Sequence, residues 1–111
     1  MKTIFVGETA HLYCGDVETL KSPVDWLYKR TMLIKDRQIQ IVSRGKLING
    51  YVGRRLGIRG STLIINNATR NDSGIYTCVE NSGIRREHNV VLHVQGYFRD
   101  WIFMLRILKV V

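Results

Sequence analysis

The sequence has few of the residues that interrupt or cross-link a chain. Its 111 residues include one proline, Pro23, and two cysteines, Cys14 and Cys78. No serine- or glycine-rich linker, internal repeat or low-complexity run divides it, so we expect one domain with one hydrophobic core. Hydrophobic residues make up 45% of the chain, which is enough for it to fold.

Enzyme motifs are also absent. There is no Gly-x-Ser-x-Gly elbow, no glycine loop that could hold a phosphate and no His-Glu-x-x-His sequence. His11, His88 and His93 lack the spacing of metal ligands, and we interpret them as solvated residues on outward strand positions or a loop edge. The sequence therefore predicts no catalytic site, no metal and no cofactor.

The two cysteines do not look like metal ligands, which usually come as closely spaced pairs with further partners. Cys14 and Cys78 lie far apart, and no Cys-x-x-Cys redox motif occurs. Their spacing alone fits either a disulfide or two free buried thiols.

Basic residues outnumber acidic ones, with 17 Lys and Arg against 9 Asp and Glu, for a net charge of +8. No aromatic residues interleave with them as a groove for single-stranded nucleic acid needs, so we expect no nucleic-acid partner. A solubilising basic surface explains most of this charge. The alternative is a patch at the loop end that binds acidic glycans or phosphates, formed by Arg44, Lys46, Arg85 and Arg86.

One stretch, from Asn71 to Cys78, reads as a tight turn that runs directly into a half-buried strand. Tyr76 and Cys78 share one face of that strand at period two. Cys14 and Trp26 precede it, which gives the order Cys…Trp…Asp-x-Gly-x-Tyr-x-Cys. This pattern resembles the immunoglobulin superfamily, and the resemblance covers about residues 4 to 94.

The resemblance implies an all-β fold, a two-sheet antiparallel sandwich joined by a Cys14–Cys78 disulfide. Closing a loop of that length would contribute about 4 kcal/mol, and a disulfide implies an oxidising compartment. Trp26 would pack on the disulfide, and the Tyr76 hydroxyl would bond back to the backbone. Members of this family often pair an arginine before strand D with the aspartate of the turn, which here matches Arg55 and Asp72.

Alternating apolar residues place the expected strands at residues 4–6, 10–14, 24–29, 37–43, 55–58, 61–65, 75–80 and 88–94. The space between the cysteines leaves room for extra edge strands, which favours the variable-type layout over the constant type. Antigen-receptor variable domains carry a Phe-Gly-x-Gly bulge before the last strand. This chain has Arg86-Glu87-His88-Asn89 there, so a non-rearranged receptor fits better than antibody-like pairing.

We assign residues 1–95 to this domain and residues 96–111 to an apolar C-terminal segment. The segment is shorter than the about 20 residues that span a bilayer and contains four charged residues, so we expect no membrane insertion. It could pack on the domain, form a dimer, lie at an interface, continue the last strand or be non-native sequence.

The apolar residues expected on the outward side of the G-F-C-C′ sheet point to a protein-binding face. We expect a receptor-type or secreted binding module there, with a protein ligand or a second copy as partner, unless the C-terminal segment covers the face. The third option is a spacer domain without a partner. The face comprises Leu27, Lys29, Ile41 (or Ile39), Val79, Val91 and His93.

The glycosylation sequon Asn67-Ala68-Thr69 would lie at the opposite end from the recognition loops and suits an extracellular or cell-surface protein. A second tripeptide, Asn71-Asp72-Ser73, is weaker because of its central aspartate. Residues 1–6 are too short for a secretory signal, so we expect that a signal peptide has been left out of this chain.

Overall fold

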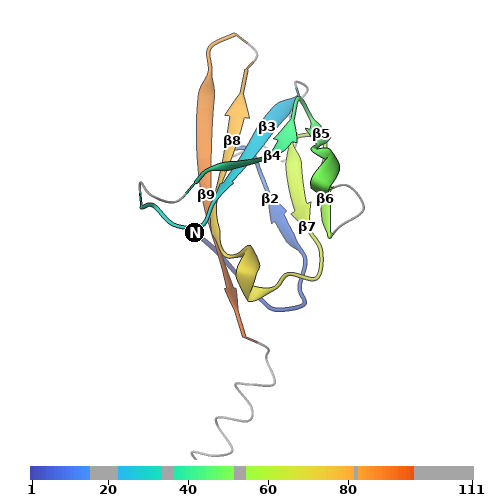
Figure 1. Cartoon of the computed structure of the whole chain (residues 1–111), viewed down its shortest axis with the longest axis vertical. Coiled ribbons are helices and arrows are strands. Elements are labelled where there is room, and N and C mark those ends of the chain that lie inside the picture. The colour runs from blue at the N-terminus through green and yellow to red at the C-terminus, as the bar shows by residue number, and fades with distance from the viewer. Residues whose placement is uncertain (16–22, 34–36, 52–54, 82, 97–111) are drawn as a thin grey trace, which may run out of the picture.

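Two β-sheets packed face to face make up the described part of the chain (Figure 1). The structure is a computed structural model that describes residues 1–15, 23–33, 37–51, 55–81 and 83–96. In these residues the strands are β1 (Lys2–Phe5), β2 (Ala10–Leu12), β3 (Val24–Lys29), β4 (Ile39–Ser43), β5 (Lys46–Leu47), β6 (Leu56–Arg59), β7 (Thr62–Ile65), β8 (Gly74–Glu80) and β9 (Arg86–Gln95). Short 3-10 turns occur at η1 (Asn49–Tyr51) and η2 (Arg70–Asp72).

The larger sheet has six strands in the order β1-β9-β8-β3-β4-β5, and the smaller has the order β2-β7-β6. All neighbouring strands are antiparallel except β1, which runs parallel to β9. The predicted all-β sandwich is therefore confirmed, with one parallel pair that the alternation pattern did not reveal. The added edge strands expected between the cysteines are β4 and β5.

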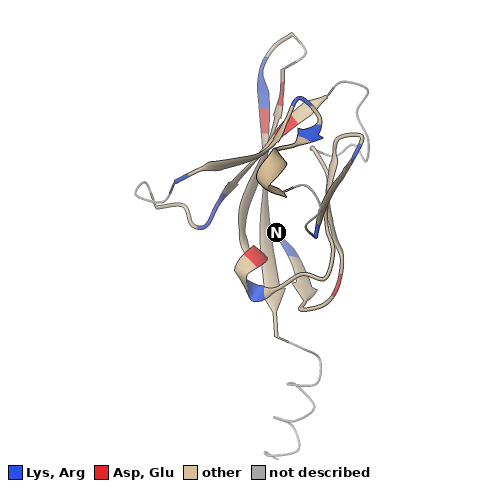
Figure 2. Cartoon of the chain, turned by 45° about the vertical axis from the view of Figure 1, so that its right-hand side comes forward, with Lys and Arg blue, Asp and Glu red and all other residues tan. Residues whose placement is uncertain are grey.

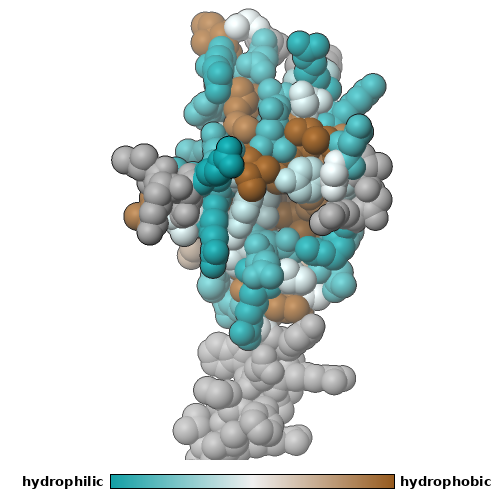
Figure 3. All heavy atoms as spheres, viewed as in Figure 1, coloured by the Kyte–Doolittle hydropathy of each residue, from teal (hydrophilic) through white to brown (hydrophobic). Residues whose placement is uncertain are grey.

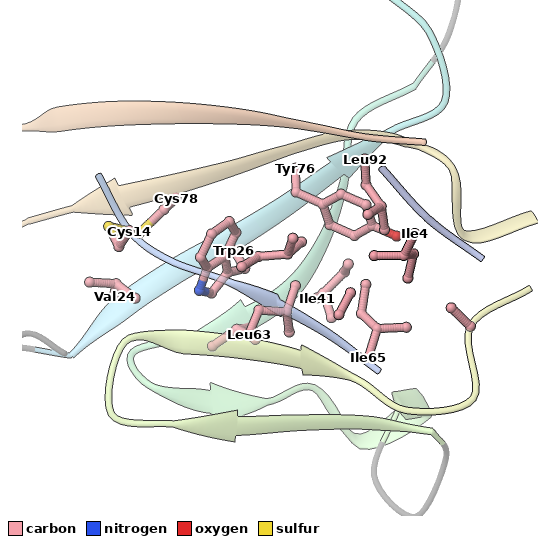
Figure 4. Close-up of a cluster of buried hydrophobic side chains, with 14 of the residues drawn as sticks. Ile4, Cys14, Val24, Trp26, Ile41, Leu63, Ile65, Tyr76, Cys78 and Leu92 are labelled. Carbon is pink, nitrogen blue, oxygen red and sulfur yellow. A yellow bond between two sulfur atoms is a disulfide. The ribbon is translucent and has the colours of Figure 1, made fainter. Parts of the chain in front are cut away.

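The strands face each other through alternate residues, as a half-buried strand requires. Cys14, two residues after β2, is bonded to Cys78 of β8, with 5.5 Å between their Cα atoms. Trp26 is fully buried beside this bond (Figure 4), and its indole N–H donates to the Ser61 carbonyl at 3.0 Å. The indole therefore fills the core without leaving its polar atom unsatisfied.

The remaining core extends along the sandwich from the tryptophan, where side chains from both sheets meet (Figure 4). Its completely buried members include Leu12, Val24, Val42, Leu63, Ile65 and Leu92. These residues come from strands β2, β3, β4, β7 and β9, so the core holds the two sheets together rather than any single hairpin.

The strand ends lie within two residues of the sequence-based expectation, and β3 has the expected bounds. β9 begins at Arg86, two residues before the start that the sequence predicts. Its pairing with β8 therefore extends to Glu80 and Arg86, which face each other across the pair. Residues 97–111, assigned above to the apolar C-terminal segment, lie outside the described residues.

Candidate functional site

The surface of the six-stranded sheet that points away from the smaller sheet is called the outer face below. The register defines it, because residues that alternate with the core positions must point the other way. Thr77 of β8 stands opposite Leu27 on one side and Asn89 on the other, and Leu27 stands opposite Gln40 of β4. These four side chains form one uncharged row across the sheet.

Two further rows flank this uncharged row. One contains Val91, Ile75 and Lys29, and Val91 is 41% exposed. The other contains Glu87, Val79 and Asp25. Four of the six residues predicted for the binding face, Leu27, Lys29, Val91 and His93, therefore point outward and are at least partly accessible.

Val79 points outward but is only 2% exposed. Ile75 and Thr77 of the same strand are also buried, at 8% and 5%. They lie on the central strand β8, where the side chains of β3 and β9 shield them from both sides. Val79 can therefore support the outer face but offers almost no contact area, which corrects its predicted role.

Ile41 does not belong to the outer face, and the prediction for this residue was wrong. It is 5% exposed and packs in the core next to Val42. The register between β3 and β4 shifts here, because Trp26 stands opposite Val42 and Leu27 opposite Gln40, which leaves Ile41 as an extra residue. Such a β-bulge breaks the two-residue period from which outward positions were assigned.

Ile39, the alternative to Ile41, also lies away from the outer face. It stands opposite the core-facing Tyr28 and is 45% exposed. With Ile41, Tyr51 and Leu56 it lines an open cavity of about 490 Å³ between β4 and β6. Gln40 is the residue that β4 contributes to the outer face. A search for apolar residues could not identify it, because it is polar.

Hydrogen bonds fix the polar part of the outer face. The Thr77 hydroxyl and the Asn89 side-chain oxygen are 2.7 Å apart, so the hydroxyl donates to the amide oxygen. Sequence reasoning missed both residues because it searched for apolar side chains. Asp25 accepts from the Arg44 backbone N–H at 2.7 Å, which holds the β4–β5 turn against β3.

The four residues of the predicted anion site lie at one end of the sandwich, in or directly after the β4–β5 and β8–β9 turns. Carboxylates are interspersed with them (Figure 2). Arg85 pairs with Glu87 at 2.9 Å, and Asp25 holds the backbone of Arg44. All four, Arg44, Lys46, Arg85 and Arg86, are exposed, but the neighbouring negative charges reduce the local positive potential.

At the opposite end, Arg55 and Asp72 form the expected ion pair, with Nη1 and Oδ2 2.7 Å apart. Burial alone would raise the pKa of Asp72, but the Arg55 guanidinium and the Thr69 backbone N–H outweigh it and hold the pKa below its usual range. The Tyr76 hydroxyl donates to the Asp72 carbonyl at 2.6 Å, and burial strongly raises the pKa of this tyrosine. This cluster closes one end of the core and has a structural role.

His88 is not the solvated outward residue that the sequence suggested. It stands opposite Cys78 on β9 and therefore faces the space between the sheets. Its side chain is 31% exposed, and its Nε2 contacts the Glu80 carboxylate. His11 and His93 are exposed, in agreement with the expectation.

Asn67 lies in the turn after β7, with an exposed side chain and a φ of 49°. Its backbone carbonyl accepts a hydrogen bond from Arg55 Nη1 at 3.1 Å, so the turn is fixed while the amide remains accessible. This is the end of the sandwich away from the β4–β5 and β8–β9 turns.

The apolar residues on the side seen in Figure 3 form separate groups among hydrophilic ones. In the described ranges, no helix has the length and apolar composition needed to cross a membrane.

Comparison with known proteins agrees with this architecture. The family model described as immunoglobulin domain matches residues 3–83. No curated protein sequence matches significantly. Among solved structures, the N-terminal eight Ig domains of Down Syndrome Cell Adhesion Molecule match with a TM-score of 0.60 and 28% identity, covering 84% of this chain and 11% of that one.

Two shorter structures align along most of their own length. Dpr1 IG1, solved bound to DIP-eta IG1, matches with a TM-score of 0.60 and 23% identity, covering 84% of this chain and 86% of that chain. The Ig1 domain of mouse SynCAM 2 matches with a TM-score of 0.60 and 20% identity, covering 86% and 91%. At these identities the two structures support the fold alone.

Proposed function

Because the chain belongs to the immunoglobulin domain family, we propose that it is an extracellular recognition module of variable type that binds a protein through its outer face. The variable subtype is supported by β4 and β5, which extend the sheet beyond β3 as extra strands do in such domains. The fold by itself hosts many functions, so the argument for binding comes from the face.

The observation that carries the proposal is the uncharged row across the centre of the outer face. Leu27, Asn89 and Gln40 reach solvent there, and Thr77 lies beneath them. Depletion of charge at the centre with polar residues around it is the usual composition of a protein interface. Val91 adds exposed apolar area next to this row.

The charges around the row support a second copy of the chain as partner. Glu87 and Asp25 lie in the flanking row on one side of the uncharged row, while Lys29 lies in the flanking row on the other side. A two-fold axis that lies in the interface along the uncharged row would place the acidic side of each copy against the basic side of the other. Isologous dimers need this kind of self-complementary surface.

Three further observations support an extracellular location. The Cys14–Cys78 bond is of the kind that persists in oxidising compartments. Asn67 is exposed, and a glycan attached there would leave the outer face free. In addition, one matching structure, at 28% identity, belongs to a protein whose name describes it as a cell adhesion molecule, Down Syndrome Cell Adhesion Molecule.

Measurement of the mass in solution tests the face directly. We expect the wild-type chain to dimerise, and Leu27→Arg or Val91→Arg to weaken association by about 30-fold, because each buries an unpaired charge in the interface. Ile64→Arg, on the outward side of β7, is the matched control and should keep the wild-type mass. A monomeric wild-type chain would reject self-association, and dimers that survive both outer-face variants would reject this face.

The rival function is binding of acidic glycans or phosphates by Arg44, Lys46, Arg85 and Arg86. The dependence of binding on salt concentration distinguishes it from protein binding through the outer face. Such binding should weaken steeply as the ionic strength rises, whereas contact through an uncharged row should change little. Replacing Arg85 and Arg86 with Glu should abolish glycan binding and leave the dimer intact. The carboxylates of Glu87 and Asp25 beside these arginines count against the rival.

A further inference from the structure

Metal-binding side chains gather around the disulfide at the end of the sandwich near the β8–β9 turn. The sulfur of Cys14, a carboxylate oxygen of Glu80 and a ring nitrogen of His88 all lie within 4.8 Å of one another. None of these residues belongs to the outer face, so the cluster is independent of the proposed binding function.

Register explains why these residues meet. Glu80 follows Cys78 by two positions on β8, so the two share the inner side of the sheet. His88 stands directly opposite Cys78 on β9. The His88 ring lies against Gly15, where an added Cβ would come within 3.1 Å of it, so the imidazole is held close to the cysteine loop.

In the disulfide form this cluster lacks a charged sulfur, since a sulfur bonded to another sulfur is not the thiolate that metals bind. Only Glu80 and His88 then offer ligands. Reduction would supply two more, because Cys14 and Cys78 would each become a thiol that can ionise. Two cysteines, one histidine and one carboxylate make a donor set that suits tetrahedral zinc.

We propose that reduction of the Cys14–Cys78 bond creates a zinc site formed by Cys14, Cys78, Glu80 and His88. A dithiol supplies two electrons and two protons, so the Cys14–Cys78 bond breaks, two thiols form and the dithiol becomes a disulfide. Zinc then displaces the two thiol protons to solvent. Glu80 binds as a carboxylate and His88 as a neutral imidazole.

The distances require only small movements. Zinc lies about 2.0 to 2.3 Å from its ligands, which places ligand atoms of a tetrahedral site about 3.3 to 3.8 Å apart. The Cys14 sulfur, the Glu80 oxygen and the His88 nitrogen, now within 4.8 Å of one another, therefore need to approach by about 1 Å. The Cys78 sulfur, now bonded to Cys14, has to move away from it to about 3.8 Å once the bond is reduced. The cysteines are buried, but the side chains of His88 and Glu80 are 31% and 21% exposed, so zinc can enter from this end.

The zinc site would replace one cross-link between the sheets by another. Cys14 follows β2 in the smaller sheet, whereas the other three ligands belong to the larger sheet. A metal bound to all four would therefore restore the connection that reduction removes. The cross-link depends on oxidation in one state and on zinc in the other.

Zinc titration of the full chain tests the proposal. The chain is reduced with a water-soluble phosphine, which takes oxygen from water to become the phosphine oxide, and is then titrated with zinc against a chromophoric chelator. We expect one zinc per reduced chain, a rise in the unfolding temperature that a chelator reverses, and no comparable binding before reduction. Cobalt in place of zinc should give tetrahedral d–d bands and a thiolate-to-cobalt charge-transfer band.

Variants separate this site from simple thiol binding. His88→Gln and Glu80→Gln should each weaken zinc binding by at least about tenfold. His11→Gln, an exposed histidine on β2, should bind as the wild type does. If the reduced chain unfolds without metal, zinc should restore its β-sheet circular dichroism in the wild type and in His11→Gln only. Absence of binding to the reduced chain, or equal binding by His88→Gln and Glu80→Gln, would overturn the proposal.

Discussion

The Asp72 side chain accepts hydrogen bonds from a neighbouring turn residue and from a residue 17 positions away. Its Oδ2 atom lies 2.7 Å from Arg55 Nη1 and 2.7 Å from the Thr69 backbone nitrogen. Its own carbonyl accepts from the Tyr76 hydroxyl. This one residue therefore links the start of β6, the turn after β7 and the start of β8.

The depressed pKa of Asp72 predicts how stability depends on pH. In the unfolded chain the Asp72 carboxyl has a pKa of about 3.9, and in the folded chain its pKa is lower. Between these two pKa values the unfolded state binds more protons than the folded state. The stabilising contribution of the carboxylate is therefore complete above the unfolded pKa and is lost as the pH falls through the folded pKa. Denaturant titrations at several pH values, from neutral to about pH 2, measure the unfolding free energy as a function of pH. On the acid side, its slope against pH should be smaller in Asp72→Asn than in the wild type.

Arg55→Gln provides the comparison for this pH dependence. It removes the cation but keeps Asp72 and its hydrogen bond from Thr69. The slope of unfolding free energy against acidic pH should therefore be smaller than in the wild type but larger than in Asp72→Asn. At neutral pH the variant should cost about 1 kcal/mol, since the Arg55 side chain is 41% exposed and solvent screens the pair. An Asp72→Asn chain with an unchanged slope would show that the carboxylate has no depressed pKa.

At the scale of elements, β8 determines the arrangement of the larger sheet. It is the third of six strands and pairs along its full length with β9 and from Ile75 to Glu80 with β3. The strand begins at Gly74, which has a φ of +154° and lies against the Tyr28 ring. The turn can lead directly into the strand here because no side chain occupies this position.

Replacing Gly74 with alanine should therefore destabilise the domain. An added Cβ would lie 2.5 Å from Tyr28 Cε2 and 2.8 Å from the Lys29 carbonyl oxygen, so both β3 and β8 would have to shift. We expect a loss of about 2 to 3 kcal/mol in unfolding free energy, measured by chemical denaturation. Gly50→Ala is the matched control, since its Cβ would meet nothing within 4 Å. Equal effects of the two variants would contradict this explanation.

At the scale of the whole molecule, the two sheets are joined by one disulfide bond and one continuous core. Cys14 and Cys78 come from different sheets and are 64 positions apart. Cross-linking such distant positions restricts the unfolded chain, which raises the free energy of the unfolded state relative to the fold.

Removal of both cysteines, as Cys14→Ala with Cys78→Ala, should lower the unfolding free energy by about 4 kcal/mol. Denaturant unfolding of this variant and of the oxidised wild type would measure the difference. Because the alanines also leave space in the core, the phosphine-reduced wild type without metal is the second comparison. A loss below about 1 kcal/mol in both would show that packing, and not the cross-link, supplies most of the stability.

The sequence by itself determined the sandwich, the disulfide and the main core positions. Its signals were local: Trp26, Tyr76 and Cys78 occupy positions whose spacing and order are specific, and the alternation of apolar residues marks most strands. The two-residue period also placed Leu27 and Val91 on the outward side of their strands. These outward positions need only the geometry of a single strand, whereas the sandwich and the disulfide were predicted from the resemblance to the immunoglobulin superfamily.

Only the tertiary structure decided the features that depend on how strands meet. The bulge opposite β3 moved Ile41 into the core, and Val79, on the central strand β8, is buried although it points outward. The pairing of β8 with β9 placed His88 beside the disulfide. A period of two fixes the side to which a residue points, but register and neighbouring strands fix what it contacts and how much solvent it meets.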